Sequence, residues 1–339
     1  MLNLIDHAAS LNGQTVIVRC NFDVPISNGQ VTDTTRLEDA VPTIKLLRQA
    51  NAKCLLLAHA GRPDGNYLPE DSLKPVTPIL STLVGEPVSF TPYTADYHQL
   101  PLSGSPIELV DNLRYWQEES ANEVGFAQFW ASHASAYVNE AFANCHRSHA
   151  SMVGIPQILT GSRFAGLALA KEIAILEKTL RQPEHPFVVI IGGAKLETKA
   201  PLVKTLSPLA DTILVGGKIA ADLAFKPHPP NVILADLLPD AKDITPASAR
   251  TFADRIMSAR TVIWNGTMGI FEEPEHQAGT RVVAQAVNQT AAFTLVGGGD
   301  TEAALTVLKL ESGIDHISSG GGAMLSYLSQ GHLVALDAL

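Results

Sequence analysis

Short apolar runs alternate with amphipathic segments along most of the chain. In the first half, apolar runs cover residues 15–19, 53–58, 107–110 and 136–138. In the second half, they cover residues 187–191, 212–215, 232–235, 261–264 and 293–296. Segments with the 3.6-residue period of a helix lie between them, as at residues 37–49, 75–84 and 119–132. Apolar runs of this kind are typical of parallel sheets that helices cover on both faces, so the pattern predicts an α/β protein with doubly wound parallel sheets.

A long helical pattern without proline covers residues 163–180 and separates the two series of strands. Residues 181–186 contain two prolines, which break that helix. The chain has 339 residues, whereas an ordinary domain has about 150, so we predict two lobes. In sheets of this kind, ligands bind beyond the carboxyl ends of the strands, and a site should therefore lie in the loops that follow the strands.

Cationic side chains recur in these loops in the first half of the chain. They are Arg36, His59, Arg62, Arg114 and Arg147. One such arginine alone is more often a solvated surface charge. Their recurrence after successive strands instead indicates a site for a small, multiply anionic metabolite, because the planar guanidinium binds carboxylate and phosphate through two hydrogen bonds.

Histidines also follow the fourth of these strands, at His146 and His149. A metal site needs a third ligand, and the sequence shows none nearby. We interpret both histidines as residues that pack the loop.

Composition narrows the class of protein. The net charge is −10, which disfavours nucleic acid as a partner and fits a soluble enzyme. The three cysteines, Cys20, Cys54 and Cys145, lie far apart and predict neither a disulfide framework nor a metal site. Neither a signal peptide nor an apolar stretch long enough for a membrane span is visible, so we expect a cytoplasmic protein without membrane partners.

The turn after residues 293–296 reads G-G-G-D-T and leads into a helical pattern. Backbone amides at Gly298 and Gly299 can approach an anion closely, and the following helix start favours phosphate. Asp300 would then offer an oxygen ligand to Mg²⁺, with the Thr301 hydroxyl beside it. In the alternative interpretation, Asp300 only caps the helix, and this stretch alone leaves both interpretations open.

Other turns of the second half repeat this design. Glycines follow the strand at 212–215, as Gly216 and Gly217, and recur at residues 320–322. Lys195 and Lys199 are four residues apart, so both would lie on one face of a helix and could reach one phosphate chain. The Walker and dinucleotide-binding patterns are both missing from the sequence, so a different nucleotide site is predicted.

Eleven short motifs occur in the order that phosphoglycerate kinases have them, and the chain resembles that family from about residue 15 to residue 330. They are V-R-C-N-F-D-V-P, T-T-R, H-A-G-R-P, S-L-K-P-V, D-N-L-R-Y, Y-V-N-E-A-F, H-R-S-H-A-S, G-G-A-K, W-N-G-T-M-G-I-F-E, V-G-G-G-D-T and S-S-G-G-G-A. The resemblance implies two Rossmann-like lobes joined by a hinge helix at 163–180. A phosphoglycerate-binding lobe would cover residues 1–162, with the tail 318–339 packing back on it, and a nucleotide-binding lobe would cover 181–317.

The resemblance also implies roles for individual residues. Phosphoglycerate is expected at Asn21, Phe22, Asp23, Arg36, His59, Ala60, Gly61, Arg62, Arg114 and Arg147. ADP or ATP is expected at Lys195, Lys199, Gly216, Gly217, Glu272, Gly298, Gly299, Asp300 and Thr301, with Glu272 at the ribose and Mg²⁺ on Asp300. Transition-state stabilisation is expected from Arg36, Lys195, Lys199, Gly321 and Gly322. Closure about the hinge helix would bring the two ligands together, and the enzyme is expected to be a monomer with only small-molecule partners.

This chain departs from the family pattern in several places. Asn21 and Asp23 exchange the usual order of acid and amide, Lys218 replaces a glycine, and Thr267 replaces a proline. Asp111 and Glu140 are each exchanged for the other acid. The segment at residues 223–247, which would wall the adenine, is much shortened, so base recognition is expected to be altered.

Two functions of other classes remain as alternatives. A catalytically weakened family member that acts as a binding protein would be expected to lose Lys199 or Arg36, and both are present. A nicotinamide dehydrogenase would need a dinucleotide-binding fingerprint after its first strand, which this sequence does not have.

Overall fold

The computed structural model describes residues 3–5, 8–224 and 227–339. The chain forms two compact units. The first holds Met1–Ile173 and His332–Leu339, and the second holds Ala174–Gly331. Each unit is built on one parallel sheet of six strands, which confirms the predicted α/β fold with two sheets.

The first sheet has the strand order β5-β6-β4-β1-β7-β8. Its strands are β1 (Thr15–Arg19), β4 (Lys53–Leu57), β5 (Ser89–Thr91), β6 (Ile107–Val110), β7 (Ala136–Asn139) and β8 (Arg163–Ala165). The helices of this unit are α1 (Thr35–Gln49), α2 (Val76–Val84), α3 (Gln117–Ser120), α4 (Val124–Ser132), α5 (Ile155–Ile158) and α13 (Val334–Asp337). A small antiparallel hairpin pairs β2 (Ile26–Ser27) with β3 (Gln30–Val31). Short helical turns complete the unit at η1 (Ala8–Leu11), η2 (Pro69–Asp71), η3 (Tyr97–Gln99), η4 (Leu113–Tyr115), η5 (Phe142–Asn144) and η6 (Ala150–Gly154).

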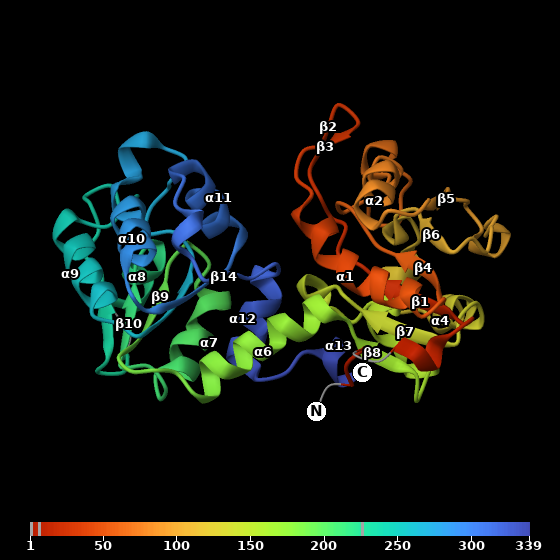
Figure 1. Cartoon of the computed structure of the whole chain (residues 1–339). Helices are drawn as coiled ribbons and strands as arrows, with labels where there is room; N and C mark the ends of the chain where they lie inside the picture. Colours follow the sequence, from red (N-terminus) through yellow and green to blue (C-terminus); the bar gives the residue numbers. More distant parts are fainter. Residues whose placement is uncertain (1–2, 6–7, 225–226) are drawn as a thin grey trace. The chain divides into compact units, whose positions relative to one another are not determined.

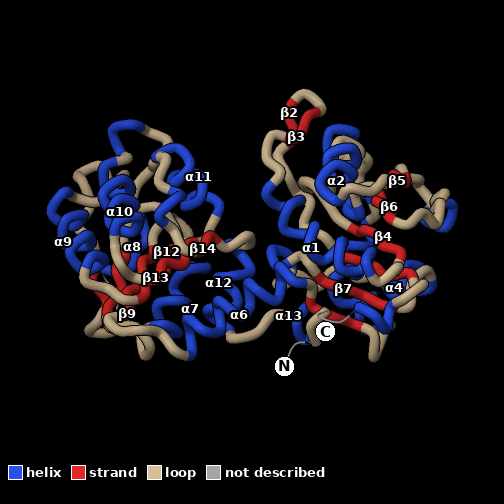
Figure 2. Tube along the Cα trace, in the orientation of Figure 1, coloured by secondary structure: helices blue, strands red, loops and turns tan. Residues whose placement is uncertain are grey.

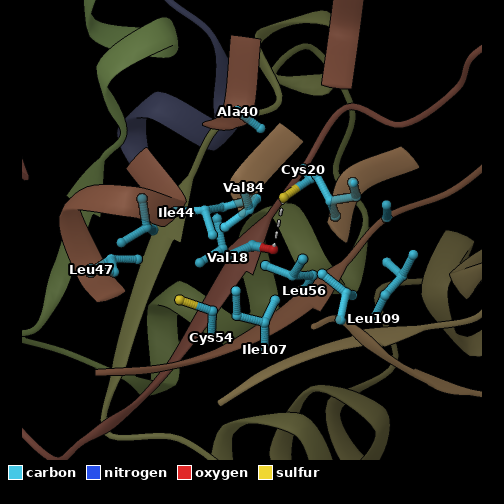
Figure 3. Packing of buried hydrophobic residues seen from close by; sticks show 14 of the residues in the cluster. Val18, Cys20, Ala40, Ile44, Leu47, Cys54, Leu56, Val84, Ile107 and Leu109 are labelled. Carbon is cyan, nitrogen blue, oxygen red and sulfur yellow. Dashed lines mark hydrogen bonds between the residues drawn. The ribbon is translucent and has the colours of Figure 1, made fainter. Parts of the chain in front are cut away.

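Alternate residues of the first sheet enter two different cores. Val18 and Leu56 point to one face, where they pack against Ile44 of α1 and Val84 of α2 (Figure 3). Ile17 and its neighbours on the other face pack against aromatic residues of α4. The two faces together explain why these strands read as continuous apolar runs, because each residue of a strand is buried on one side or the other.

The second sheet has the strand order β11-β10-β9-β12-β13-β14. Its strands are β9 (Phe187–Ile191), β10 (Thr212–Val215), β11 (Val232–Leu234), β12 (Thr261–Asn265), β13 (Phe293–Val296) and β14 (His316–Ile317). The helices are α7 (Leu196–Leu206), α8 (Lys218–Ala224), α9 (Pro246–Met257), α10 (Ala278–Gln289), α11 (Gly299–Leu308) and α12 (Gly321–Gln330), with short turns η7 (Pro274–His276) and η8 (Glu311–Gly313). Helices α9 and α10 lie side by side in Figure 1, and their Phe252 and Val283 pack on Trp264 of β12. In each unit, helices surround the strands (Figure 2).

The predicted helix at residues 119–132 is wrong as one helix, because the structure has two, α3 and α4. Asn122 between them adopts a left-handed backbone with φ 52°. The Glu123 carboxylate then accepts a hydrogen bond from Phe126 N at 2.7 Å, which caps the new helix. Helical periodicity alone did not indicate this interruption.

The predicted helix at residues 163–180 starts later than expected, as α6 (Leu167–Arg181). Residues 163–165 instead form β8, which pairs with β7 at the edge of the first sheet. The Glu140 carboxylate accepts a hydrogen bond from Leu169 N at 3.0 Å, so it pairs with an amide at the start of α6 that has no partner within the helix. The Thr43 hydroxyl donates to the same carboxylate. A distant acid therefore decides where this helix begins.

The end of the chain divides at residue 332. Residues 318–331, including α12, belong to the second unit, whereas His332–Leu339 belong to the first. The returning tail is thus shorter than the predicted 318–339, and Ala335 N donates to Cys145 O at 3.1 Å. Within the described part of the chain, every helix is too short or too polar to traverse a bilayer.

Candidate functional site

The predicted cations of the first unit all follow strands of its sheet. β1 pairs in parallel with β4 and β7, and β4 pairs with β6, so the loops after these strands begin at one edge. Arg36 lies in the first turn of α1, after β1, and the loop after β4 carries His59 and Arg62. Arg114 follows β6 and Arg147 follows β7. All five cations therefore come after strands of this sheet, although Arg36 is in a helix and not in a loop.

His59 lies beneath this edge and is held in one tautomer. Its Nδ1 is 2.9 Å from Nη2 of Arg19, which can only donate. Nδ1 is therefore the acceptor, and the ring proton sits on Nε2, which lies 4.0 Å from Asp23 Oδ2. Burial, with Arg19 and Arg114 nearby, holds the pKa of His59 well below its usual value. His59 is thus a neutral donor that offers Nε2–H to a ligand.

Sequence reasoning missed Arg19, although it is the residue that organises this edge. The side chain is fully buried, and its Nε donates to Ser151 Oγ at 2.8 Å while Nη1 donates to Cys20 O. Ser151 in turn donates from Oγ to Glu119 at 2.6 Å and from its backbone N to the same carboxylate at 2.9 Å. A charged residue inside the apolar run T-V-I-V-R was the one available signal.

Positive charge is concentrated at this edge despite the acidic chain. Burial together with Arg19 and Arg147 lowers the pKa of Arg114 to about 10, so it stays protonated at neutral pH. Burial, together with the charges of Arg114, Arg19 and Arg147, lowers the pKa of His149 to about 3. The lowered pKa values show that nearby acids do not fully neutralise the guanidinium groups of this cluster. An anionic ligand would supply the missing negative charge.

Asp23 links three parts of the predicted substrate site. Its Oδ1 accepts the backbone N–H of Gly61 at 3.0 Å, and Nη1 of Arg36 donates to its backbone carbonyl. Arg114 Nη1 donates to the Gly61 carbonyl at 2.7 Å. Asp23 in this chain therefore ties the loop after β1 to the loop after β4, and the exchange with Asn21 places an acid where the family pattern has an amide.

Two of the predicted substrate-binding residues do not present side chains to a ligand. Phe22 and Ala60 belong to the buried core of the first unit, with exposed fractions of 0% and 4%. Both sit in motifs whose neighbours are polar, and the packing of the loop turns these two inward. Only their backbone groups are available for binding.

In the second unit, the glycine-rich turns pack on one another at the carboxyl edge of the sheet. A Cβ on Gly192 would lie 2.2 Å from the carbonyl oxygen of Thr267, and one on Gly321 would lie 2.4 Å from the Cα of Gly298. Gly193 N donates to Thr267 O at 2.8 Å. Side chains are excluded at these turns, so their backbone groups come together there.

Thr301 has a different role from the one predicted. It is fully buried, and its Oγ1 accepts a hydrogen bond from Gly266 N at 2.8 Å. Asn265 reinforces the same contact by donating from Nδ2 to Gly297 O at 2.6 Å. Thr301 therefore fastens the turn after β13 to the turn after β12 instead of lying beside a metal.

Asp300 is not the cap of α11. The N-cap residue is Gly298, with φ 112° and no side-chain hydrogen bond, and Asp300 lies exposed in the first turn. Its carboxylate has no hydrogen bond or ion pair with any residue that the structure describes. An exposed, unengaged carboxylate at this turn is the kind of oxygen ligand that Mg²⁺ takes.

The two predicted lysines occupy different environments. Helix α7 begins at Leu196, so Lys195 is its exposed N-cap residue, whereas Lys199 is 9% exposed inside the helix. Burial lowers the pKa of Lys199 to about 8, and the charge of Asp300 opposes that shift. A desolvated ammonium group facing the charge of Asp300 is suited to a polyphosphate with its metal ion.

The remaining predicted residues lie along the same edge or close to it. Gly216 and Gly217 directly follow β10, and Lys218 begins α8 with an exposed side chain. Gly321 and Gly322 open α12, as predicted for amides at a helix start. Glu272 is exposed in the loop between β12 and α10.

The shortened segment at residues 223–247 is tied to the loop that carries Glu272. His276 contacts Glu273 Oε2 through Nδ1 and Asp240 Oδ2 through Nε2, both at 2.7 Å. Lys242 Nζ is 2.8 Å from Glu273 Oε2. Residues Phe225 and Lys226 of this segment lie outside the described residues.

The acids Glu273 and Glu275 and the ring of His276 have ligand atoms within 4.8 Å of one another. Both ring nitrogens of His276 already meet carboxylates, which leaves neither lone pair for a metal ion. The contacts instead fit a protonated imidazole. Desolvation lowers the pKa of His276, but the hydrogen bonds that its ring donates to Asp240 and Glu273 outweigh this effect and raise the pKa above its usual value. This histidine is a charged link between the two loops.

We expect the stability of the second unit to depend on the charge of His276. Because its pKa is raised on folding, its contribution is fully present below the unfolded pKa and is lost as the pH rises through the folded value. His276→Gln should therefore lower the melting temperature at pH 6 more than at pH 9. The measurement is thermal denaturation of parent and variant across that range, with His332→Gln, an exposed histidine beside Asp337, as the control. A melting-temperature difference that does not change with pH would contradict this assignment.

This chain is similar to known proteins along nearly its whole length. The family model described as "Phosphoglycerate kinase" matches residues 5–227 and 233–331. The phosphoglycerate kinase of Dictyoglomus turgidum is 36% identical over 383 aligned positions, covering 97% of this chain and 96% of the relative. That of Moorella thermoacetica is 37% identical, covering 97% of each. The break in the family match at residues 228–232 falls within the shortened segment.

Solved structures show the same similarity to phosphoglycerate kinases. The structure of phosphoglycerate kinase from Coxiella burnetii has a TM-score of 0.82 at 29% identity and covers 97% of this chain and 96% of its own. The crystal structure of phosphoglycerate kinase from Pyrococcus horikoshii OT3 has a TM-score of 0.79 at 26% identity and covers 100% of this chain and 98% of its own.

One unit has an arginine-rich sheet edge, and the other has a glycine-rich edge with a buried lysine. The chain is also similar to these proteins throughout, and together these findings identify it as a kinase. More narrowly, the chain belongs to the phosphoglycerate kinase family, which confirms the predicted resemblance.

Proposed function

We propose that this enzyme transfers a phosphoryl group reversibly from 1,3-bisphosphoglycerate to ADP, giving 3-phosphoglycerate and ATP. In the reverse direction, the carboxyl group of 3-phosphoglycerate is the acceptor. The observation that carries this proposal is the arginine cluster at the carboxyl edge of the first sheet, where buried Arg19 sets His59 as a donor. Each unit then binds one of the two anionic substrates.

Phosphoglycerate is assigned to the first unit. Arg36, Arg62, Arg114 and Arg147 supply permanent positive charge, and Nε2–H of His59 supplies a directed hydrogen bond. Arg114 is already oriented by its bond to the Gly61 carbonyl, so little side-chain entropy is lost when a ligand binds. Asn21, which is 7% exposed, adds an amide at the same edge.

The nucleotide is assigned to the second unit, with its phosphates near Lys195, Lys199 and the turn at residues 298–300. Mg²⁺, which neutralises the phosphate oxygens when it is bound with the nucleotide, would be held by the exposed carboxylate of Asp300. Glu272 would meet the ribose, and Gly216 and Gly217 would give the nucleotide a close backbone approach.

Catalysis in this proposal consists of positioning and charge stabilisation, since phosphoryl transfer through a loose transition state needs little proton chemistry from the protein. Arg36, Lys195 and Lys199 would surround the transferring oxygens. The amides of Gly321 and Gly322, at the start of α12, would add donors. The two substrates must meet for transfer, and we propose that movement about α6 brings them together and excludes water.

The enzyme is proposed to act as a monomer in the cytoplasm, without nucleic acid or membrane partners. Nothing favours the alternative of a catalytically weakened binding protein, because Arg36 and Lys199 are present. The deciding experiment is a coupled assay that follows ATP formation from 1,3-bisphosphoglycerate and ADP. If the parent chain turned over no faster than a Lys199→Ala variant, the result would refute the enzymatic proposal and favour the binding protein.

The half-buried Arg147 should contribute mainly to binding the acid substrate, because it holds the end that does not react. We expect Arg147→Ala to raise the KM for 3-phosphoglycerate roughly tenfold to a hundredfold, since a hydrogen bond to a charged group is worth about 1.5–3 kcal/mol. The kcat should change by no more than about threefold. Steady-state kinetics give both values, and Arg250→Ala, an exposed arginine of α9, is the control. Unchanged affinity in titration calorimetry would remove Arg147 from the site.

The shortened segment predicts weak discrimination among purine bases. The phosphate-binding residues are all present, whereas the part that would wall the adenine is reduced, and one imperfect pocket contact is worth roughly 1–3 kcal/mol. We expect GDP to replace ADP with a loss of less than about tenfold in kcat/KM. Exposed Lys218 could partly replace the lost base contacts by reaching the α-phosphate. Lys218→Gly should therefore weaken the binding of ADP and GDP alike. A preference for ADP above about a hundredfold in the parent would show that a full adenine wall exists.

A further inference from the structure

A cavity of about 330 Å³ opens at the amino edge of the second sheet. Glu184, Arg260 and Asp315 line it, and each lies just before a strand, β9, β12 and β14 respectively. The end of α6 adds Lys178 and Thr179. The glycine-rich turns follow the same strands at the opposite edge, and a strand of four or five residues separates the edges by roughly 15 Å. The cavity is therefore separate from the proposed nucleotide site.

Two cations of this cavity are available to a ligand. Arg260 is fixed by its backbone, because its N donates to Pro186 O at 2.8 Å and its O accepts Phe293 N at 2.9 Å. Its guanidinium and the ammonium of Lys178 are exposed, and neither makes a hydrogen bond or ion pair with any part of the chain that the structure describes. A rigid backbone beneath a free guanidinium lets a ligand bind without reordering the loop.

The carboxylates of the cavity are differently placed. Asp315 Oδ2 accepts hydrogen bonds from Thr294 N at 2.8 Å and Thr294 Oγ1 at 3.0 Å, so part of its charge is already used. Glu184 is exposed and lies in the segment between α6 and β9. An anion would therefore be attracted to the side formed by Arg260 and Lys178.

The floor and wall of the cavity add specificity. The hydroxyls of Thr261 and Thr179 are on nearly buried residues and donate to the carbonyls of Glu184 at 2.8 Å and Ile175 at 2.7 Å. Because their protons are used, their oxygens can only accept from a ligand. Phe293 leaves 39% of its surface exposed at the wall, although it begins a strand that is otherwise buried. An aromatic ring in that position offers a stacking or edge contact to a flat ligand.

We propose that this cavity is a second binding site, for a small aromatic anion that carries a hydrogen-bond donor. The anionic group lies between Arg260 and Lys178, the ring packs on Phe293, and the donor meets the threonine oxygens of the floor. A volume near 330 Å³ is within the range of small-molecule pockets and is ample for one ring with two substituents. The site is independent of the phosphoryl-transfer reaction.

The test uses the full chain and 4-hydroxybenzoate as the probe, with the uncharged 4-hydroxybenzamide for comparison. Titration by ligand-observed NMR should give a Kd on the order of 1 mM for the acid, as expected for a ligand of this size, and binding of the amide should be at least about tenfold weaker. Arg260→Gln and Phe293→Ser should each weaken binding of the acid about fivefold or more. Arg255→Gln, an exposed arginine of α9 that does not line the cavity, is the matched control and should bind as the parent does.

Thermal denaturation supplies a second readout. At saturating probe, the melting temperature should rise in the parent and in Arg255→Gln but not in Arg260→Gln. If Arg260→Gln does not fold, Lys178→Gln takes its place in both measurements. Equal binding by the cavity variants and the control would overturn the proposal. Displacement of the probe by excess ADP with Mg²⁺ would also overturn it, because the probe would then occupy the glycine-rich edge.

Discussion

Replacing Lys199 with alanine should lower turnover about a hundredfold, which corresponds to roughly 3 kcal/mol of transition-state stabilisation. The side chain is 9% exposed, so its ammonium acts where water competes little. The KM for 3-phosphoglycerate should change much less, because Lys199 lies in the second unit. Steady-state kinetics on both substrates separate the two effects, and a variant with near-normal turnover would remove Lys199 from the catalytic group.

Two further variants sharpen that test. Lys204→Ala alters an exposed lysine of the same helix and should leave turnover unchanged. Burial lowers the pKa of Lys199 to about 8, so kcat/KM for the nucleotide should fall as the pH rises through this value and the free enzyme loses the charge. Lys199→Arg keeps its charge, and the same fall should be absent from its pH profile.

Asp300→Asn should weaken the binding of Mg-ADP tenfold or more, which corresponds to about 1.4 kcal/mol, and should lower turnover with it. The melting temperature should stay within a few degrees, because the carboxylate is exposed and makes no hydrogen bond or ion pair with any described residue. Calorimetry with and without Mg²⁺ gives the direct measurement. In the parent, Mg²⁺ should tighten ADP binding, and in the variant this gain should largely disappear.

The control for Asp300 comes from its own helix. Glu302 is the other acid in the first turn of α11, so Glu302→Gln removes a charge that interacts with the helix dipole in the same way. If both variants lost Mg-ADP affinity equally, Asp300 would be acting through the dipole and not as a ligand. A capping role is already excluded, because Gly298 is the N-cap of α11 and no side chain caps it.

Several elements were predictable because their cause is local. Residues 15–19, 107–110, 187–191 and 293–296 form strands with the predicted bounds, since uninterrupted apolar runs between turn residues leave few alternatives. The gathering of the cations and glycines at one edge of each sheet was also predictable, because parallel strands bring their carboxyl ends together. Motif order in the sequence was sufficient for the family, which the comparisons confirm.

Other features depended on contacts between residues far apart in the chain. The helix predicted at residues 163–180 starts late because residues 163–165 form β8, which pairs with β7, and because the Glu140 carboxylate accepts a hydrogen bond from the amide of Leu169. Phe22 and Ala60 turn inward because the core of the first unit surrounds them. Periodicity describes only neighbours along the chain, and these outcomes are decided by what packs on the segment from elsewhere.

The chemistry of the candidate site divides in the same way. The sequence by itself determined which charged and glycine residues the chain has and which strands they follow. Only the tertiary structure decided that Arg19 fixes the proton of His59, that Thr301 fastens two turns instead of meeting a metal, and that burial lowers the pKa of Lys199. The reason is physical: a tautomer, a buried hydrogen bond and a pKa shift each depend on the distance and desolvation of groups from different strands, and neither quantity is encoded in local spacing.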